Sequence, residues 1–126
     1  MKLSLSVPIL LLIAFAQTSQ MTAQDTSASD SLFVHALLYK WSDNLSLDKK
    51  NDFLNLFKGL PKKIDGLQNV GIMDVSSSKD GFDNLLVLRF TSIEALNRYQ
   101  GHPDHHLIDS IGPTVLKQYN YFRYWE

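Results

Sequence analysis

The first and last strands predicted from this sequence are apolar on both of their faces. Residues 32–41 read LFVHALLYKW, and residues 115–125 read VLKQYNYFRYW. Successive side chains of a strand point to opposite sides, so each segment presents aromatic or aliphatic groups in both directions. A sheet built on these strands has two apolar faces, and both of them need to be covered.

The segments between these two strands alternate between helical and extended patterns. Ser46 is a suitable N-cap for a helix, and apolar residues recur at helical spacing up to Leu60. Thr91 to Glu94 has the spacing of a capping box and predicts the start of a second helix. The expected elements are a strand at 32–41, a helix at 46–60, strands at 66–76 and 84–90, helix segments at 92–99 and 102–112, and a strand at 115–125.

This order, β-α-β-β-α-β, predicts an α+β fold of the ferredoxin-like type with a four-stranded antiparallel sheet. The predicted helices are too few to cover both faces of the sheet, so they can cover one face only. The other face would leave an aromatic patch exposed to water, which monomers seldom tolerate. We therefore expect a homodimer in which a second copy of the chain covers that face.

Size and charge exclude several classes of protein. A chain of 126 residues has room for one domain, and 44% apolar residues are ample for a core. The formal net charge of -1 argues against a nucleic-acid partner, since phosphate binding needs a surplus of basic residues. The chain has no cysteine, so it forms no disulfide and performs no thiol chemistry.

The amino terminus has the layout of a secretory signal peptide. One basic residue, Lys2, is followed by an apolar run that is too short to span a bilayer, and then by a polar stretch. We expect a signal peptide at 1–23 (with cleavage possible after residue 16), a flexible leader at 24–31 and the domain at 32–126. The mature protein is then extracytoplasmic, either periplasmic or secreted, with no membrane span after signal removal.

Three of the four histidines lie in the stretch YQGHPDHH at residues 99–106. His102 precedes a proline, which disfavours helical geometry, so this residue is expected between two helix segments. His106 should point about 100° away from His105 around a helix and is expected to be solvated. The spacing is poor for a metal site, because helical ligand pairs sit three or four residues apart and need further ligands. We expect no metal and no cofactor.

Residues 32–126 resemble the stress-responsive A/B barrel (Dabb) domain family. The resemblance rests on VHALLYKW, GLPKKIDGL, DNLLVLRFTSIEALNRYQGHPDHH and the closing aromatic strand, and its most specific element is Tyr-x-x-His-Pro-x-His. It implies that two ferredoxin-like units pair into a dimeric α/β barrel. The family includes a boiling-stable plant stress protein and olivetolic acid cyclase, a plant polyketide cyclase.

The resemblance also implies candidate site residues. The active tyrosine and histidine of the cyclase match Tyr99 and His105, and its cavity-lining histidine matches His35. In that chemistry an imidazole removes a proton next to a carbonyl while a tyrosine hydroxyl stabilises the enolate, which suits the imidazole pKa of about 6.5. Leu37 and Tyr39 follow on the same face of the first strand and are expected to line the same cavity.

Three functions stay open at this stage. The first is an exported homodimer that binds a small apolar molecule inside the barrel. The second is a cofactor-independent enzyme that uses Tyr99 and His105 for acid–base catalysis. The third is a purely structural stress protein with a filled interior. For His35, a structural role is a further alternative: a buried imidazole that is hydrogen-bonded across the sheet.

Overall fold

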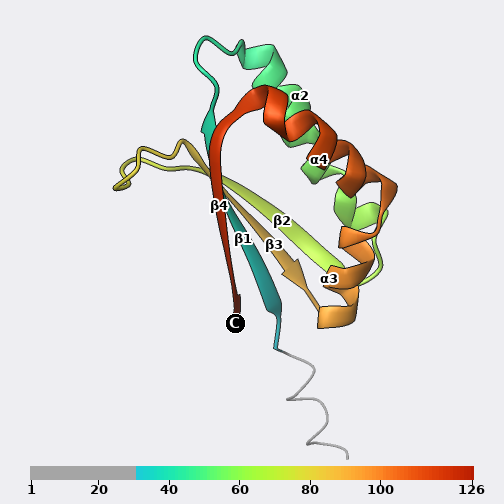
Figure 1. Ribbon diagram of the computed structural model, residues 1–126. Helices are drawn as coiled ribbons and strands as arrows, with labels where there is room; N and C mark the ends of the chain where they lie inside the picture. Colours follow the sequence, from blue (N-terminus) through green and yellow to red (C-terminus); the bar gives the residue numbers. More distant parts are fainter. Residues whose placement is uncertain (1–30) are drawn as a thin grey trace, which may run out of the picture. The chain divides into compact units, whose positions relative to one another are not determined.

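The computed structural model describes residues 31–126, which form one compact unit (Figure 1). The expected signal peptide and residues 24–30 of the expected leader lie outside the described residues. The elements are β1 (Phe33–Trp41), α2 (Leu47–Lys58), the short 3-10 helix η1 (Leu60–Lys62), β2 (Leu67–Asp74), β3 (Asn84–Phe90), α3 (Ile93–Gln100), α4 (Pro103–Val115) and β4 (Leu116–Trp125). The expected ferredoxin-like α+β fold is confirmed.

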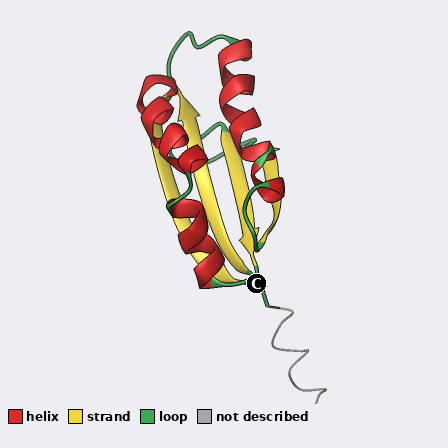
Figure 2. Ribbon diagram, turned by 90° about the vertical axis from the view of Figure 1, so that its right-hand side faces the viewer, coloured by secondary structure: helices red, strands yellow, loops and turns green. Residues whose placement is uncertain are grey.

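The four strands form one antiparallel sheet in the order β2-β3-β1-β4. β1 is central, and its register with β4 places His35 opposite Arg123 and Tyr39 opposite Tyr119. All of the described helices lie on one face of this sheet (Figure 2). Among residues 31–126, no helix has the length and apolar character needed to cross a membrane.

The helix ends follow local rules, with two departures from expectation. Ser46 caps α2 by accepting from the Lys49 N–H, as its position predicts. α3 is capped by Ser92, which accepts from the Ala95 N–H, and not by Thr91, so the expected capping box is wrong by one residue. α4 continues past the expected end at Gly112 to Val115, and the Leu116 N–H closes its last turn on the Gly112 carbonyl.

One face of the sheet packs against the helices to form the core. Alternate residues of β1 and β3 point toward the helices and meet apolar groups of α2 and α3. Phe53 and Phe57 of α2 contact the ring of Tyr39, with ring centroids 5.8 and 6.1 Å apart. The fully buried members of this core include Phe57, Leu60, Leu86, Leu88 and Phe90.

No helix of residues 31–126 covers the opposite face of the sheet. This face carries the other alternate residues, and Phe122 and Tyr124 of β4 stack there with ring centroids 6.1 Å apart. Their side chains are 48% and 41% exposed, and Met73 of β2 is 43% exposed. This bare apolar surface, here called the rear face, agrees with the two-faced pattern of the sequence.

Candidate functional site

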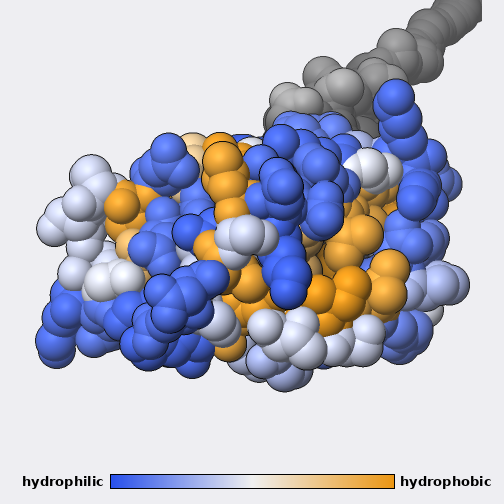
Figure 3. Space-filling model, turned by 90° about the horizontal axis from the view of Figure 1, so that it is seen from above, coloured by the Kyte–Doolittle hydropathy of each residue, from blue (hydrophilic) through white to orange (hydrophobic). Residues whose placement is uncertain are grey.

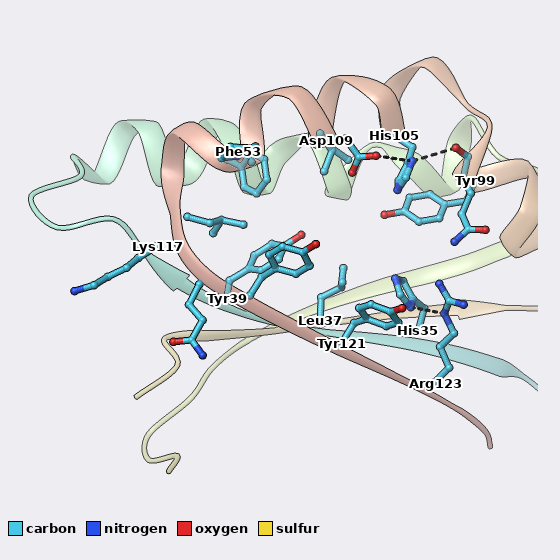
Figure 4. Close-up of a pocket in the computed structure, with 17 residues that line it drawn as sticks. His35, Leu37, Tyr39, Phe53, Tyr99, His105, Asp109, Lys117, Tyr121 and Arg123 are labelled. Atoms are coloured by element: carbon cyan, nitrogen blue, oxygen red, sulfur yellow. Dashed lines mark hydrogen bonds and ion pairs between the residues drawn. The ribbon is translucent and has the colours of Figure 1, made fainter. Parts of the chain in front are cut away.

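A pocket of about 660 Å³ lies between the sheet and α4 (Figure 4). β1 and β4 form its floor, and α4 with the end of α3 forms its roof. Tyr119 and Tyr121 of β4 are 62% and 51% exposed, so the pocket is open to solvent along this edge strand. Its lining consists of His35, Leu37, Tyr39, Phe53, Tyr99, Gln100, His105, Ile108, Asp109, Gly112, Pro113, Leu116, Lys117, Gln118, Tyr119, Tyr121 and Arg123.

The structure brings all five candidate site residues around this one pocket, which lies inside a single subunit. His35, Leu37 and Tyr39 come from β1, and Tyr99 and His105 come from the helical layer. The location differs from the expectation of a ligand inside the barrel. Two sheets that pair through their rear faces would enclose the opposite side of β1, because side chains two residues apart share one face.

His35 is held in one neutral tautomer. Its ring is only 5% exposed, and Nδ1 accepts a hydrogen bond from Arg123 Nε at 3.1 Å. Burial, the Arg123 charge and the nearby His105 lower its pKa to about 4. A neutral imidazole that accepts at Nδ1 carries its proton on Nε2, and this nitrogen points toward Tyr99 (Figure 4). His35 therefore presents a hydrogen-bond donor to the pocket.

His105 has the opposite arrangement. Its Nδ1 lies 3.1 Å from the carbonyl oxygen of Gln100 and 3.5 Å from Oδ2 of Asp109. Both of these oxygens are acceptors, so Nδ1 carries the proton when the ring is neutral. Nε2 then has a free lone pair, and Figure 4 shows this nitrogen directed into the pocket. His105 can thus accept a proton from a bound molecule.

Tyr99 lies between the two imidazoles. Its ring meets that of His105 edge-on, with centroids 4.6 Å apart, and the centroid of His35 is 6.3 Å away. Burial, together with the Asp109 carboxylate, raises the pKa of its hydroxyl far above the usual value, so the group stays protonated. Within residues 31–126 this hydroxyl has no hydrogen-bond partner. It points into the pocket, where it can donate to a ligand (Figure 4).

These three side chains make a coherent chemical site. His35 and Tyr99 present two donors, which suit an oxygen atom that gains negative charge. His105 presents an acceptor on the other side, which suits removal of a proton from a neighbouring carbon or hydroxyl. Leu37, Phe53 and Ile108 supply apolar walls beside this polar group.

Sequence reasoning missed several pocket residues. It did not name Arg123, and it did not include Asp109 or Tyr121 among the candidate site residues. Arg123 becomes a candidate only when β4 is known to pair with β1 so that it stands opposite His35. The two-residue alternation of β4 gives the face of the side chain, but it does not give that register.

The remaining histidines have structural or solvent positions. Nδ1 of His102 accepts from the Asp104 N–H at 3.0 Å, so this residue is the N-cap of α4 and lies between the helices as expected. His106 is exposed. In the part of the chain that the structure describes, no three His, Cys, Asp or Glu residues are grouped so that they could hold a metal ion.

Solved structures show that other proteins share this fold. A dimeric ferredoxin-like protein of unknown function from Thermobifida fusca YX is similar, with TM-score 0.64, 22% identity, and coverage of 75% of this chain and 90% of that chain. A hydroxynitrile lyase from Passiflora edulis is similar, with TM-score 0.69, 11% identity and coverage of 75% and 93%. A Dabb family protein from Mesorhizobium loti MAFF303099 gives TM-score 0.63, 21% identity and coverage of 75% and 96%.

The fold and the pocket thus define a ferredoxin-like α+β protein with a site between its sheet and its helices. The sequence model of the stress responsive A/B barrel domain matches residues 33–122. The chain belongs to this family, Dabb, as the resemblance implied. No curated protein matches the sequence significantly.

Proposed function

We propose that this protein binds a small organic molecule in the pocket beneath α4. The observation that carries the proposal is the convergence of His35, Tyr99 and His105 on one open volume of about 660 Å³. This volume lies within the range of about 300–1,000 Å³ that is usual for small-molecule sites. The ligand would place an oxygen-bearing group at these side chains and an apolar body against the aliphatic wall.

The buried Tyr99 hydroxyl supports binding over a purely structural role. A buried polar group without a partner costs stability, so a solid structural core would be expected to pair it or to replace it. In this chain it instead faces a pocket that is large enough for a ligand.

Native mass spectrometry of protein purified from its own host tests the binding proposal. We expect a small molecule retained at one per subunit, and its loss in a Gly112→Phe variant. A Cβ at Gly112 would meet only the Leu116 side chain, at 4.0 Å, so the new ring has room to enter the pocket from the roof. Gly59→Phe is the matched control. Among residues 31–126, nothing beyond its two chain neighbours lies within 4 Å of a Cβ added at Gly59, and Gly59 does not line the pocket. Equal retention by both variants would reject the proposal.

We also propose that two subunits pair through the rear face as a homodimer. The exposed rings of Phe122 and Tyr124 support this, since burial of aromatic groups is a main source of association energy. Two similar solved structures, from Thermobifida fusca YX and Bacteroides fragilis NCTC 9343, are described as dimeric. Light scattering should give twice the subunit mass for the natural protein and the single mass for Phe122→Glu. A natural protein that is monomeric at micromolar concentration would contradict the pairing.

A second candidate function is cofactor-independent acid–base catalysis at the same pocket. The observation that favours it is the pairing of His105 Nδ1 with the Gln100 carbonyl and Asp109, which directs a basic Nε2 into the site. His105 would remove a proton next to a ligand carbonyl, while Tyr99 and His35 would donate to the developing oxyanion. One similar solved structure is named a hydroxynitrile lyase.

Proton exchange on a simple ketone tests this chemistry without knowledge of the natural substrate. 4-Phenyl-2-butanone in D₂O should exchange its α-protons faster in the presence of the protein, as followed by NMR. His105→Gln should remove most of the acceleration, by a factor of about 10²–10⁴ for a lost general base. Asp104→Asn serves as a control, because this half-buried residue pairs with Lys63 and does not line the pocket. Exchange that is unchanged in His105→Gln would exclude this role.

We further propose that the protein works outside the cytoplasm, on the pattern of residues 1–23. Fractionation of host cells should find a mature form with a new amino terminus after residue 16 or residue 23 in the extracytoplasmic fraction. Full-length protein confined to the cytoplasm would exclude export.

A further inference from the structure

The charged side chains that line the pocket differ in whether they form ion pairs. Lys117 pairs with Asp43, with Nζ 3.2 and 3.3 Å from the two carboxylate oxygens. Asp109 lies beside His105. Arg123 is the third charged group of the lining, and within residues 31–126 it has no carboxylate partner. The pocket therefore holds a guanidinium that forms no ion pair with a carboxylate of residues 31–126.

Arg123 is an exposed residue of β4 whose side chain makes two contacts within residues 31–126. Its Nε donates to His35 Nδ1 at 3.1 Å, and its Cζ lies 5.0 Å from the centre of the Tyr121 ring. These two contacts restrain the guanidinium. The terminal nitrogens make no hydrogen bond within residues 31–126, so their N–H groups are free to donate. An oriented guanidinium with its terminal donors unused matches the two oxygens of a carboxylate.

The neighbouring side chain adds a donor to the same place. His35 is the neutral tautomer with its proton on Nε2, because Arg123 occupies Nδ1. Arg123 and His35 together therefore present donors only to an incoming anion. The acceptor of the site, His105, comes from α4 on the other side of the pocket.

We propose that the molecule bound in this pocket is a carboxylate, whose anionic group is held by the terminal N–H groups of Arg123 beside His35. The inference rests on the proposed binding function and names its ligand class. The apolar body of the ligand extends from Arg123 toward Phe53 and Ile108, and any carbonyl along it passes Tyr99 and His105. The shared chemistry of the class is one carboxylate attached to an apolar chain or ring.

Pairs of probes that have nearly equal shape but different charge test the proposal with the mature protein. Octanoate and octanamide differ in charge but hardly in size, and 4-phenylbutyrate and its amide form a second pair. Calorimetric titration at pH 7.5 should give at least about tenfold tighter binding of each acid than of its amide, as expected for charge-assisted hydrogen bonds. In Arg123→Gln this preference should fall to about twofold or less, while amide binding stays within about twofold of the natural protein.

Arg89 provides a matched control. It lies on β3 on the rear face, is paired with Glu126 at 2.9 Å, and does not line the pocket. Arg89→Gln removes the same charge from the sheet and should keep the full preference for the acids. Equal preference loss in both variants would mean that the effect comes from net charge and would overturn the proposal.

The other outcomes are also decisive. One outcome is that the amides bind as tightly as the acids and that Gly112→Phe abolishes the binding of both. This result would support the binding function and reject the proposal that the ligand is a carboxylate. No binding of any probe by a folded protein would reject both. An Arg123→Gln variant with a changed subunit count and an unchanged preference for acids would assign the guanidinium to a subunit contact and overturn the proposal.

Discussion

The space between the sheet and the helices has two unlike halves. In the packed half, defined by Phe57, Leu60, Leu86, Phe90 and Leu96, each side chain is 0–3% exposed. In the open half, beneath α4, the aromatic side chains of β4 stand around a pocket and remain largely exposed. Both halves use the same two-residue alternation of apolar groups. An apolar pattern therefore shows which way a side chain points, but not whether anything covers it.

The position of each strand in the sheet explains the difference. β3 has neighbours on both sides and helices above it, whereas β4 is at the edge and, among residues 31–126, pairs with β1 alone. α4 runs directly into β4 at Leu116, so the helix rises from the end of the strand and leaves a gap above it. Another groove lies between α2 and α4, lined in part by Phe53, Leu56 and Ile111. Seen from above, the surface carries an apolar patch bordered by polar groups (Figure 3).

The comparison is tested most strongly by removal of one ring from each half. Phe57→Ala should lower the free energy of unfolding by about 3–5 kcal/mol, because a fully buried ring leaves a cavity. Tyr121→Ala, at 51% exposure in the open half, should cost less than about 1 kcal/mol. Urea unfolding followed by circular dichroism measures both changes. Similar losses for the two variants would remove the distinction between the halves.

The open half should also give the domain a dependence on pH. The folded pKa of His35, about 4, lies below its unfolded value, so the unfolded chain binds a proton first as pH falls. Stability from this group is complete above about pH 6.5 and is lost between about pH 6.5 and pH 4. A loss of about 2–3 kcal/mol is expected over this window.

His35→Gln isolates that contribution. Its unfolding free energy should change less than that of the natural protein between pH 7 and pH 4, by the same 2–3 kcal/mol or so. Urea unfolding at a series of pH values gives the two curves. Parallel curves would show that His35 titrates alike in the folded and unfolded chain.

The packed half should have no room for one additional carbon atom at Gly66, where the chain passes close to α3. Gly66 precedes β2 with φ of 89°, and a Cβ there would lie 2.6 Å from Ala95 Cβ and 2.9 Å from Thr91 Oγ1. Gly66→Ala should therefore cost about 1–3 kcal/mol through strain at positive φ and this overlap. Gly59→Ala is the control, since Gly59 has φ of -84° and open space. Thermal unfolding should show Gly59→Ala unchanged or slightly more stable, and a neutral Gly66→Ala would contradict the close packing.

The sequence predicts the packed half better than the open half. The span of β3 and the Ser46 cap of α2 follow from local pattern and are confirmed. The two-faced pattern of β4 also predicts which aromatics share a face, and the register agrees. The predicted end of α4, at Gly112, was wrong. The helix continues through Pro113, although proline usually breaks a helix.

The chemistry of the open half depends on contacts between distant segments. The proton position on His35 is set by Arg123, 88 residues later in the chain. The proton position on His105 is set by the Gln100 carbonyl and Asp109, which are near in sequence, but only once the turn between α3 and α4 is formed. Sequence patterns identify the histidines and the tyrosine, whereas their roles as donor or acceptor follow only from the tertiary structure.

The smallest expected effect on stability comes from Tyr99→Phe, and the same change should give a large effect on α-proton exchange. Tyr99→Phe removes one hydroxyl from a ring that is 2% exposed. Because this hydroxyl has no partner within residues 31–126 and faces the pocket, its loss should change the unfolding free energy by less than about 0.5–1 kcal/mol. The same change should slow α-proton exchange of 4-phenyl-2-butanone by about 10²-fold or more, as for loss of an oxyanion donor. Tyr39→Phe, which alters another buried phenol of the same lining, should leave that exchange within about tenfold of the natural rate if Tyr99 is the specific donor. A large loss of stability in Tyr99→Phe with unchanged exchange would instead make this residue part of the packed half.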